Sequence, residues 1–540
     1  MKIARYFQSK LFVFISFVTF SMTTYFGIAY ITFSRDMMLL LMGLFNVLFL
    51  WNLDYVKKQT KLELFKLYVL QFLLFKIIAE TFVTLTLFSN NSIYSFTLLI
   101  VAGSFLILVV KHQKLYAHFG FSIVFTYGYF HMIYQSFLRE YAIVAIALLP
   151  LIFIALSSYL GKGNKALGTR FRITSLVVSG LVLIYLSAMS LSGNNAQIFL
   201  ALLLLSSQFV YLAFTTKRKA YSYPALILLN IAFVYLGVVL DYTFSNILNL
   251  LFVLQVLLYL NLYIYLSSKL VLFKESSLWI TSCSIFTILM LKILELQWLE
   301  LSVGLAIISG LFYLSYRKVQ NEMVKNIAVY GFPISLIAAG MVLYLYFNET
   351  IPFYEKHIEV SVHTMIVAIL SIGIGSLFKK TEKLFFQVFF ISGQVLSFLA
   401  FLFLLDSLLP PIVVTLLIVI STVINVWSVQ QYRHHLLWIP VLMTSIGVYV
   451  SLLSVFNFQE PSFNIAYYLI GPLIFLWIAE LLGKYAVSGQ PYFFWWSQIM
   501  NVFAIPVGFV LILIEDVTPW LYVLDRKSTR LNSSHHQVSR

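Results

Sequence analysis

Long apolar segments constrain the fold of this chain more than any other feature of its sequence. Nineteen runs of helical length contain few charged residues, and about 20 apolar residues in a helix suffice to cross the hydrocarbon core of a bilayer. A transmembrane β-strand would instead show about ten residues of alternating polarity. The runs lie at residues 11–33, 37–53, 67–88, 93–110, 119–137, 141–160, 173–191, 196–215, 224–240, 246–266, 278–294, 301–316, 327–347, 360–378, 384–405, 412–429, 436–456, 465–482 and 499–514.

The composition agrees with a membrane location. Hydrophobic residues make up 61% of the chain and charged residues 10%, whereas a soluble domain has about 25% charged residues. A water-soluble chain of 540 residues could not cover so much apolar surface with polar groups. The sequence therefore predicts an all-α protein, a polytopic transmembrane helical bundle with about 19 spans and short loops.

Basic residues are concentrated in alternate connections between the runs. If the N-terminus is cytoplasmic, the inward segments hold 26 Lys and Arg and the outward loops hold three, at Arg35, Arg139 and Lys356. Twelve acidic residues lie in the outward loops. Because short loops rich in Lys and Arg are retained in the cytoplasm, this pattern predicts a cytoplasmic N-terminus. The many spans and very short loops favour the plasma membrane of a bacterium.

The runs follow one another without a linker or a soluble domain, so residues 1–524 are expected to form one multi-span membrane domain. Pro224, Pro333 and Pro440 each follow an inward loop and an aromatic residue, at intervals of about four spans. One interpretation is a degenerate four-span repeat at 217–330, 325–435 and 433–524. The alternative is a shared way of starting a helix, since proline is tolerated in the first turn.

Residues 525–540 differ abruptly from the rest of the chain. Their sequence, which begins DRKSTRLNSSH, resembles the translation of a sequencing adapter. We therefore expect the native part to stop near Leu524 and the natural protein to continue beyond it. The segment holds four of the basic residues and one acidic residue, so the formal net charge of +15 falls to +12 without it. The sorting of charges between loops explains this remaining charge, and no nucleic-acid partner is implied.

The strongest candidate site is a pair of charges in the middle of one span. Lys76 lies about nine residues into the run 67–88, or about 14 Å at 1.5 Å per residue, and Glu80 follows one turn later on the same face. His131 lies at a similar depth in the run 119–137. Ionisable residues inside a membrane are costly and often functional. We expect an intramembrane polar cluster of Lys76, Glu80 and His131 that relays protons or anchors a ligand; the alternative is a structural ion pair and a core histidine.

Other polar residues within the runs have simpler interpretations. Four glutamines are expected to form hydrogen bonds between helices, Gln71, Gln208, Gln255 and Gln394. Lys292 lies near the outer end of its run and is expected to extend its ammonium group to the interface. Cys283 is the single cysteine, so the chain has no disulfide framework, and we expect it to be a small buried residue.

A weaker candidate lies in the longest outward loop, which groups Glu355, His357 and Glu359. Carboxylates beside a histidine can bind a metal or act as a general base, but the spacing matches no metal-ligand motif. A solvated acidic loop is the simpler interpretation. The sequence contains no phosphate-binding loop, zinc-ligand spacing or nucleophile elbow, so we predict no cofactor, metal or catalytic residue.

Three functions are compatible with this sequence. The first is a transporter or permease, with a small molecule or a lipid as substrate and the bilayer as its other partner. The second is a non-catalytic membrane scaffold or assembly partner. The third is an enzyme resembling glycosyltransferases that use lipid-linked sugars at the outer face. These enzymes have a sizeable acidic first outer loop, whereas this chain has Ser34, Arg35 and Asp36 there. Transport is the leading interpretation, and the chain is not expected to be an enzyme.

Overall fold

The computed structural model describes residues 10–32, 34–59, 63–265, 268–455 and 461–515. Each of the nineteen predicted apolar runs coincides with a helix, and the described residues contain no strand. The all-α fold is therefore confirmed. The predicted adapter-like segment, residues 525–540, lies outside the described residues. The chain divides into two compact units, residues 1–288 and 289–540, and the predicted four-span repeat stays a prediction.

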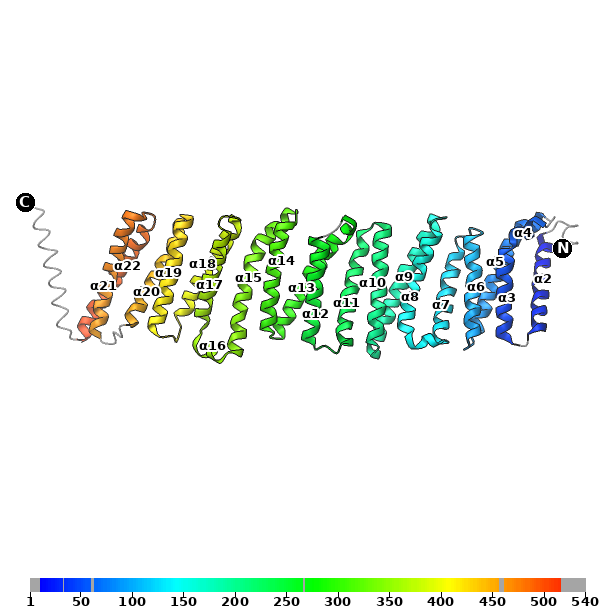
Figure 1. The fold of residues 1–540 in the computed structure, drawn as a ribbon, viewed down its shortest axis with the longest axis horizontal. Coiled ribbons are helices and arrows are strands. Elements are labelled where there is room, and N and C mark those ends of the chain that lie inside the picture. Colours follow the sequence, from blue (N-terminus) through cyan, green and yellow to red (C-terminus); the bar gives the residue numbers. More distant parts are fainter. Residues whose placement is uncertain (1–9, 33, 60–62, 266–267, 456–460, 516–540) are drawn as a thin grey trace, which may run out of the picture. The chain divides into compact units, whose positions relative to one another are not determined.

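The first unit is a series of antiparallel helices joined by short turns (Figure 1). Helices α6 to α12 lie side by side in nearly chain order, and α5 packs against α2, α3 and α6. A short helix, α4, is bent by 62° from α3. The helices are α2 (Lys10–Ile31), α3 (Arg35–Trp51), α4 (Leu53–Gln59), α5 (Glu63–Thr86), α6 (Ser92–Val110), α7 (Ala117–Tyr134), α8 (Ala142–Leu160), α9 (Lys165–Met189), α10 (Asn195–Thr216), α11 (Ser222–Val239), α12 (Phe244–Leu258), which continues as a π-helix (Tyr259–Ile264), and most of α13 (Lys274–Leu294).

The second unit has the same construction. Its helices are the end of α13, α14 (Trp298–Lys318), α15 (Glu322–Thr350), α16 (Pro352–His357), α17 (Val360–Phe378), α18 (Lys383–Leu404), α19 (Pro411–Tyr432), α20 (Trp438–Val455), α21 (Pro461–Tyr485) and α22 (Gln490–Glu515). The short helix α16 lies at the opposite end of this unit from the turn between α14 and α15 (Figure 1). Short 3₁₀ turns complete the described helical structure of both units, at Phe137–Tyr141, Ser190–Ser192, Lys219–Tyr221, Ser268–Phe273 and His435–Leu437.

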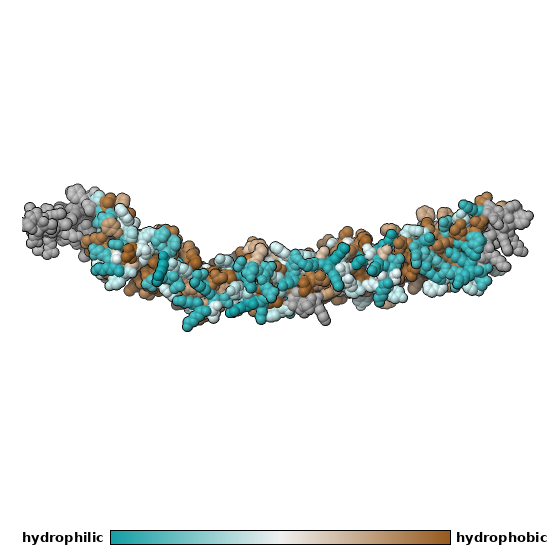
Figure 2. All heavy atoms as spheres, turned by 90° about the horizontal axis from the view of Figure 1, so that it is seen from above, coloured by the Kyte–Doolittle hydropathy of each residue, from teal (hydrophilic) through white to brown (hydrophobic). Residues whose placement is uncertain are grey.

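Fifteen of the described helices are long and apolar enough to cross a membrane, or sixteen if α3 and α4 form one broken span. Helix α7 is not among them, because two histidines and three tyrosines lower its mean hydropathy. The exact count of nineteen spans therefore stays a prediction. Figure 2 looks onto the end at which α4 lies, and hydrophilic side chains gather over the helix ends on this face.

The tightest packing in both units is between two helices joined by a predicted inward loop, such as α10 with α11 and α17 with α18. Lipid chains are as apolar as leucine, so helices associate in a membrane through close packing and hydrogen bonds. Buried serines supply such bonds by donating to a carbonyl of the paired helix. These bonds run from Ser206 to Ala225 (2.8 Å), from Ser309 to Phe332 (2.9 Å) and from Ser371 to Phe389 (2.9 Å).

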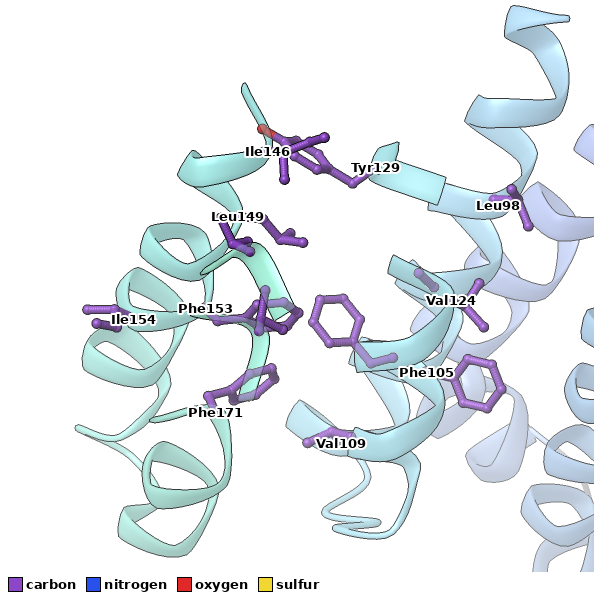
Figure 3. Close-up of a cluster of buried hydrophobic side chains, with 14 of the residues drawn as sticks. Leu98, Phe105, Val109, Val124, Tyr129, Ile146, Leu149, Phe153, Ile154 and Phe171 are labelled. Atoms are coloured by element: carbon purple, nitrogen blue, oxygen red, sulfur yellow. The ribbon is translucent and has the colours of Figure 1, made fainter. Parts of the chain in front are cut away.

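Aromatic side chains fill the core between α6 and α9 (Figure 3). The rings of Phe153 on α8 and Phe171 on α9 lie 6.3 Å apart between their centroids, and Phe121 of α7 packs edge-on against both. This core holds α7 to the pair formed by α8 and α9.

The proline pattern is only partly a helix-start pattern. Pro224 and Pro440 each occupy the third residue of a helix, α11 and α20, where their missing N–H needs no partner. Pro333 instead lies inside α15, which begins eleven residues earlier at Glu322 with Asn321 as its cap. The expectation of one shared start is therefore wrong for Pro333, because the polar cap rather than the proline begins α15.

Candidate functional site

The two charges predicted in the first unit lie on α5, and α3 supplies a third polar group beside them. Lys76 is ten residues from Thr86 at the end of α5, or about 15 Å along the axis, which is half of a hydrocarbon core of about 30 Å. Asn46 lies eleven residues from Arg35 at the start of α3, at the same depth. The three side chains therefore meet near the middle of the membrane.

Lys76, Glu80 and Asn46 form a closed triangle of polar contacts, which we call the α3–α5 polar cluster. The Lys76 ammonium lies 3.3 Å from Oε1 of Glu80, one turn away on the same helix. It also donates a hydrogen bond of 2.7 Å to Oδ1 of Asn46. The amide nitrogen of Asn46 donates in turn to Oε2 of Glu80. One neutral amide thus bridges both charges across two helices.

The surroundings of the cluster are apolar and mostly closed. The side chain of Asn46 is buried, and those of Lys76 and Glu80 are 9% and 17% exposed. The Phe45 ring centroid lies 5.1 Å from the ammonium, at cation–π distance. A lone charge at this depth costs about 2.5 to 3.5 kcal/mol on insertion scales, so the mutual contacts offset a large part of that cost. Oε1 of Glu80 accepts no hydrogen bond from the described residues.

His131 has different neighbours. Its Nδ1 forms a hydrogen bond of 2.7 Å with the Ser95 hydroxyl on α6, and its ring packs edge-on against Tyr94 and Phe88. None of the ring and hydrogen-bond contacts described for His131 involves Lys76 or Glu80. The structure brings Lys76 and Glu80 together with Asn46, and it places His131 in a separate aromatic setting between α6 and α7.

The outward-loop residues are spread over α16 and the residues after it. Glu355 and His357 are exposed, and the ring of His357 packs on Phe353. Glu359 accepts a hydrogen bond of 3.0 Å from the backbone N–H of Leu408, which ties this loop to the connection between α18 and α19. Nowhere in the described ranges do three or more His, Cys, Asp or Glu side chains form a group suited to a metal ion.

Two buried polar groups in the outer part of the second unit also tie helices together. Nε2 of His363 on α17 donates to the Gly340 carbonyl of α15 at 2.8 Å, and its Nδ1 forms a hydrogen bond with the Tyr354 hydroxyl of α16. Burial raises the pKa of Tyr354, so this hydroxyl keeps its proton and can donate it. Lys292, expected at the interface, is instead buried, with its ammonium 3.4 Å from Gln297 and 4.0 Å from Glu300.

Other polar predictions have mixed outcomes. Gln208 on α10 donates to Ser175 at 2.9 Å and to Ser179 at 2.6 Å, both on α9, and Gln255 on α12 donates to Asn230 on α11. Interhelical hydrogen bonding is thus confirmed for Gln208 and Gln255, and for Gln71 and Gln394 it stays a prediction. Cys283, expected to be buried, is exposed on α13; the apolar run defined its helix, but not the face on which it lies.

Asn46 is the member of the cluster that sequence reasoning missed. A signal was present, because Asn46 is the only strongly polar residue between Met37 and Trp51. Asparagine is uncharged, however, and it also occurs as ordinary packing in membrane helices. Its role became visible only when packing placed α3 against α5.

These features define an integral, multi-pass membrane protein with a polar cluster at the depth of the bilayer centre. No protein-family model, curated protein sequence or solved structure matches the chain significantly.

Proposed function

We propose that this protein is an ion-coupled transporter of the bacterial plasma membrane, in which the α3–α5 polar cluster binds and releases a proton. The observation that carries the proposal is the contact between the Lys76 ammonium and the Glu80 carboxylate at mid-membrane. Charged side chains at this depth are costly, and a transport pathway is one reason to keep them. Sorting of Lys and Arg to one end of the helices is the pattern that orients a protein in such a membrane.

The cluster can change its charge in a simple way. Protonation of Glu80 would remove the negative charge that balances Lys76 and would leave the ammonium held only by Asn46 and the Phe45 ring. The helix pair α3 and α5 would then carry a net positive charge inside the membrane, which favours either an incoming anion or a rearrangement of the pair. A proton and a second solute would thus compete for one set of groups.

Proton movement tests this proposal without knowledge of the substrate. The full chain is reconstituted in liposomes that hold a pH-sensitive dye, and a potassium gradient with valinomycin sets the membrane potential. We expect proton entry with the wild type and only the protein-free rate with Glu80→Gln. Glu63→Gln serves as the control, because Glu63 is an exposed carboxylate at the first residue of the same helix. Equal rates for Glu80→Gln and the wild type would contradict the proposal.

A second candidate, a membrane scaffold, is favoured by the surface of α2. Only 11% of the residues in its apolar segment are buried, and Phe26 is 65% exposed. A helix with so much free apolar surface can pack against a partner helix as well as against lipid. A photo-crosslinking amino acid placed at position 26 should then form a covalent adduct with one discrete membrane protein in cells. Position 184 on α9 serves as the control, because Ile184 is 69% exposed. A diffuse pattern equal to that at position 184 would contradict the scaffold.

A further inference from the structure

A second site of a different kind lies at the basic-loop end of the first unit. A cavity of about 330 Å³ opens between α9 and α10, and α8 forms its floor. Helices α9 and α10 each pack against α8 but contact each other little, which leaves room between them. The lining residues are Ile154, Ser157 and Ser158 of α8, Gly161 directly after α8, Lys165, Gly168, Thr169 and Arg172 of α9, and Tyr211, Leu212 and Thr215 of α10.

The shape of the cavity is built by close helix packing. A Cβ atom on Gly168 would lie 2.7 Å from the Cα of Gly161. The backbones can therefore approach this closely only because both residues are glycines. The Ser157 hydroxyl fastens this contact by donating to the Gly168 carbonyl at 2.6 Å. On the other side, the hydroxyls of Ser158 and Tyr211 join α8 to α10 by a hydrogen bond of 2.8 Å.

The charge lining the cavity is positive and unbalanced. Lys165 and Arg172 are its two charged residues, and none of its lining residues is acidic. Between Glu140 and Asp241 the sequence contains no Asp or Glu. Arg172 donates one hydrogen bond, of 3.2 Å, to the Thr169 hydroxyl, and a guanidinium has five N–H groups. The cavity thus offers several charged donors without an acidic acceptor.

The depth of these residues matches the level of lipid headgroups. Arg172 lies seven residues from the start of α9 at Lys165, or about 10 Å along the helix. Ile154 lies six residues from the end of α8, and Figure 3 shows it on the side of α8 away from Phe153. Leu212 lies four residues from the end of α10. Ile154 and Leu212 therefore lie at about the depth of Arg172 and give the cavity an apolar wall there, whereas Lys165 lies nearer to water.

We propose that this cavity binds a phosphate group, presented by an anionic lipid of the leaflet at the basic-loop end. Arg172 and Lys165 would hold the phosphate oxygens, since guanidinium and ammonium groups form charge-assisted hydrogen bonds with phosphate. Ser158 and Tyr211 share one hydrogen bond, so one of their two hydroxyl protons stays available to the rest of the headgroup. The acyl chains would leave along Ile154 and Leu212. Basic pockets between helices on the cytoplasmic side are suited to such headgroups. None of these residues belongs to the α3–α5 polar cluster.

The test measures lipid binding to the full, purified chain in detergent by native mass spectrometry. The ligands are dioleoyl-phosphatidylglycerol, zwitterionic dioleoyl-phosphatidylcholine and, as a soluble competitor, glycerol 3-phosphate. We expect tight binding of the anionic lipid, and binding about 30-fold weaker in Lys165→Gln/Arg172→Gln. Each of the two cations is expected to supply about half of the binding free energy that corresponds to this factor. The matched control is Lys162→Gln/Arg218→Gln, which removes the same charge from exposed loop residues outside the cavity.

The possible outcomes separate the sources of phosphate. Displacement of the lipid by millimolar glycerol 3-phosphate would support a phosphate site open to soluble esters, whereas lipid binding unaffected by it supports the lipid as source. Arg172→Lys keeps the positive charge but removes the planar guanidinium that can donate two parallel hydrogen bonds to phosphate. This variant should therefore bind the anionic lipid more weakly than the wild type and more tightly than the double variant. Equal weakening in the cavity and control double variants, or equal binding of the zwitterionic and anionic lipids, would overturn the proposal.

Discussion

At the scale of single residues, the α3–α5 polar cluster shows how three side chains can balance and bridge their charges in hydrocarbon. Lys76 and Glu80 balance in charge, and Asn46 offers an acceptor to one and a donor to the other. An amide is suited to this position because it carries both groups without adding charge. Each member therefore depends on the others. Removal of one charged side chain is expected to lower the free energy of unfolding more than removal of Lys76 and Glu80 together.

The first prediction follows from that dependence. Lys76→Ala should lower the free energy of unfolding by about 3 to 5 kcal/mol, because it leaves the Glu80 carboxylate buried without its cation. Lys76→Ala with Glu80→Ala should be less destabilising, because no charge remains. Thermal unfolding of the detergent-purified protein measures both variants.

A matched control for this pair is present on the same helix. Lys66 and Glu63 form an ion pair of 2.7 Å, with the lysine 36% and the glutamate 83% exposed. Exposed pairs contribute less than about 1 kcal/mol, so Lys66→Ala should change the unfolding temperature little. Equal losses in Lys76→Ala and the double variant would mean that Lys76 and Glu80 do not stabilise each other.

At the scale of helices, the first unit depends on contacts that only small residues permit. One example is the contact between Gly161, directly after α8, and Gly168 of α9, where backbone lies against backbone. Such contacts replace the hydrophobic driving force, which is absent between helices surrounded by lipid. The same contact shapes the cavity lined by Lys165 and Arg172.

The second prediction concerns this contact. Gly168→Ala should destabilise the protein by about 1 to 3 kcal/mol, since the new methyl group must push α8 and α9 apart. A methyl group added at Gly180, on the same helix, would meet no neighbouring atom within 4 Å. Gly180→Ala should therefore be neutral, or stabilising by up to about 1 kcal/mol through higher helix propensity. Thermal unfolding measures the stability of both variants. Equal unfolding temperatures for Gly168→Ala and Gly180→Ala would contradict close packing at Gly168.

Sequence alone predicts helices well here because the bilayer requires long apolar runs. It also predicts that Lys76 and Glu80 share a face, because that relation lies within one helix. It does not predict the direction in which a helix faces its neighbours. For this reason sequence reasoning misses Asn46, groups His131 with Lys76 on depth alone, and expects Lys292 at the interface although it is buried.

At the scale of the whole molecule, the fold requires hydrocarbon as its solvent, and the connections between helices alternate between basic and acidic ones. Basic residues such as Lys217 to Lys219 lie at one end of their helices, and acidic residues such as Glu140 and Asp241 lie at the other. Both proposed sites depend on this sorting. The α3–α5 polar cluster needs a position at mid-membrane, and the cavity needs the leaflet on the basic side.

Chemical labelling of loop cysteines tests this claim most directly. Cys283 is first replaced by serine, and single cysteines are then placed at the exposed positions Glu140 and Arg218. In intact cells, a membrane-impermeant maleimide should label Glu140→Cys and spare Arg218→Cys, and both should react after permeabilisation. Labelling of both positions in intact cells, or of Arg218→Cys alone, would contradict the orientation on which the account depends.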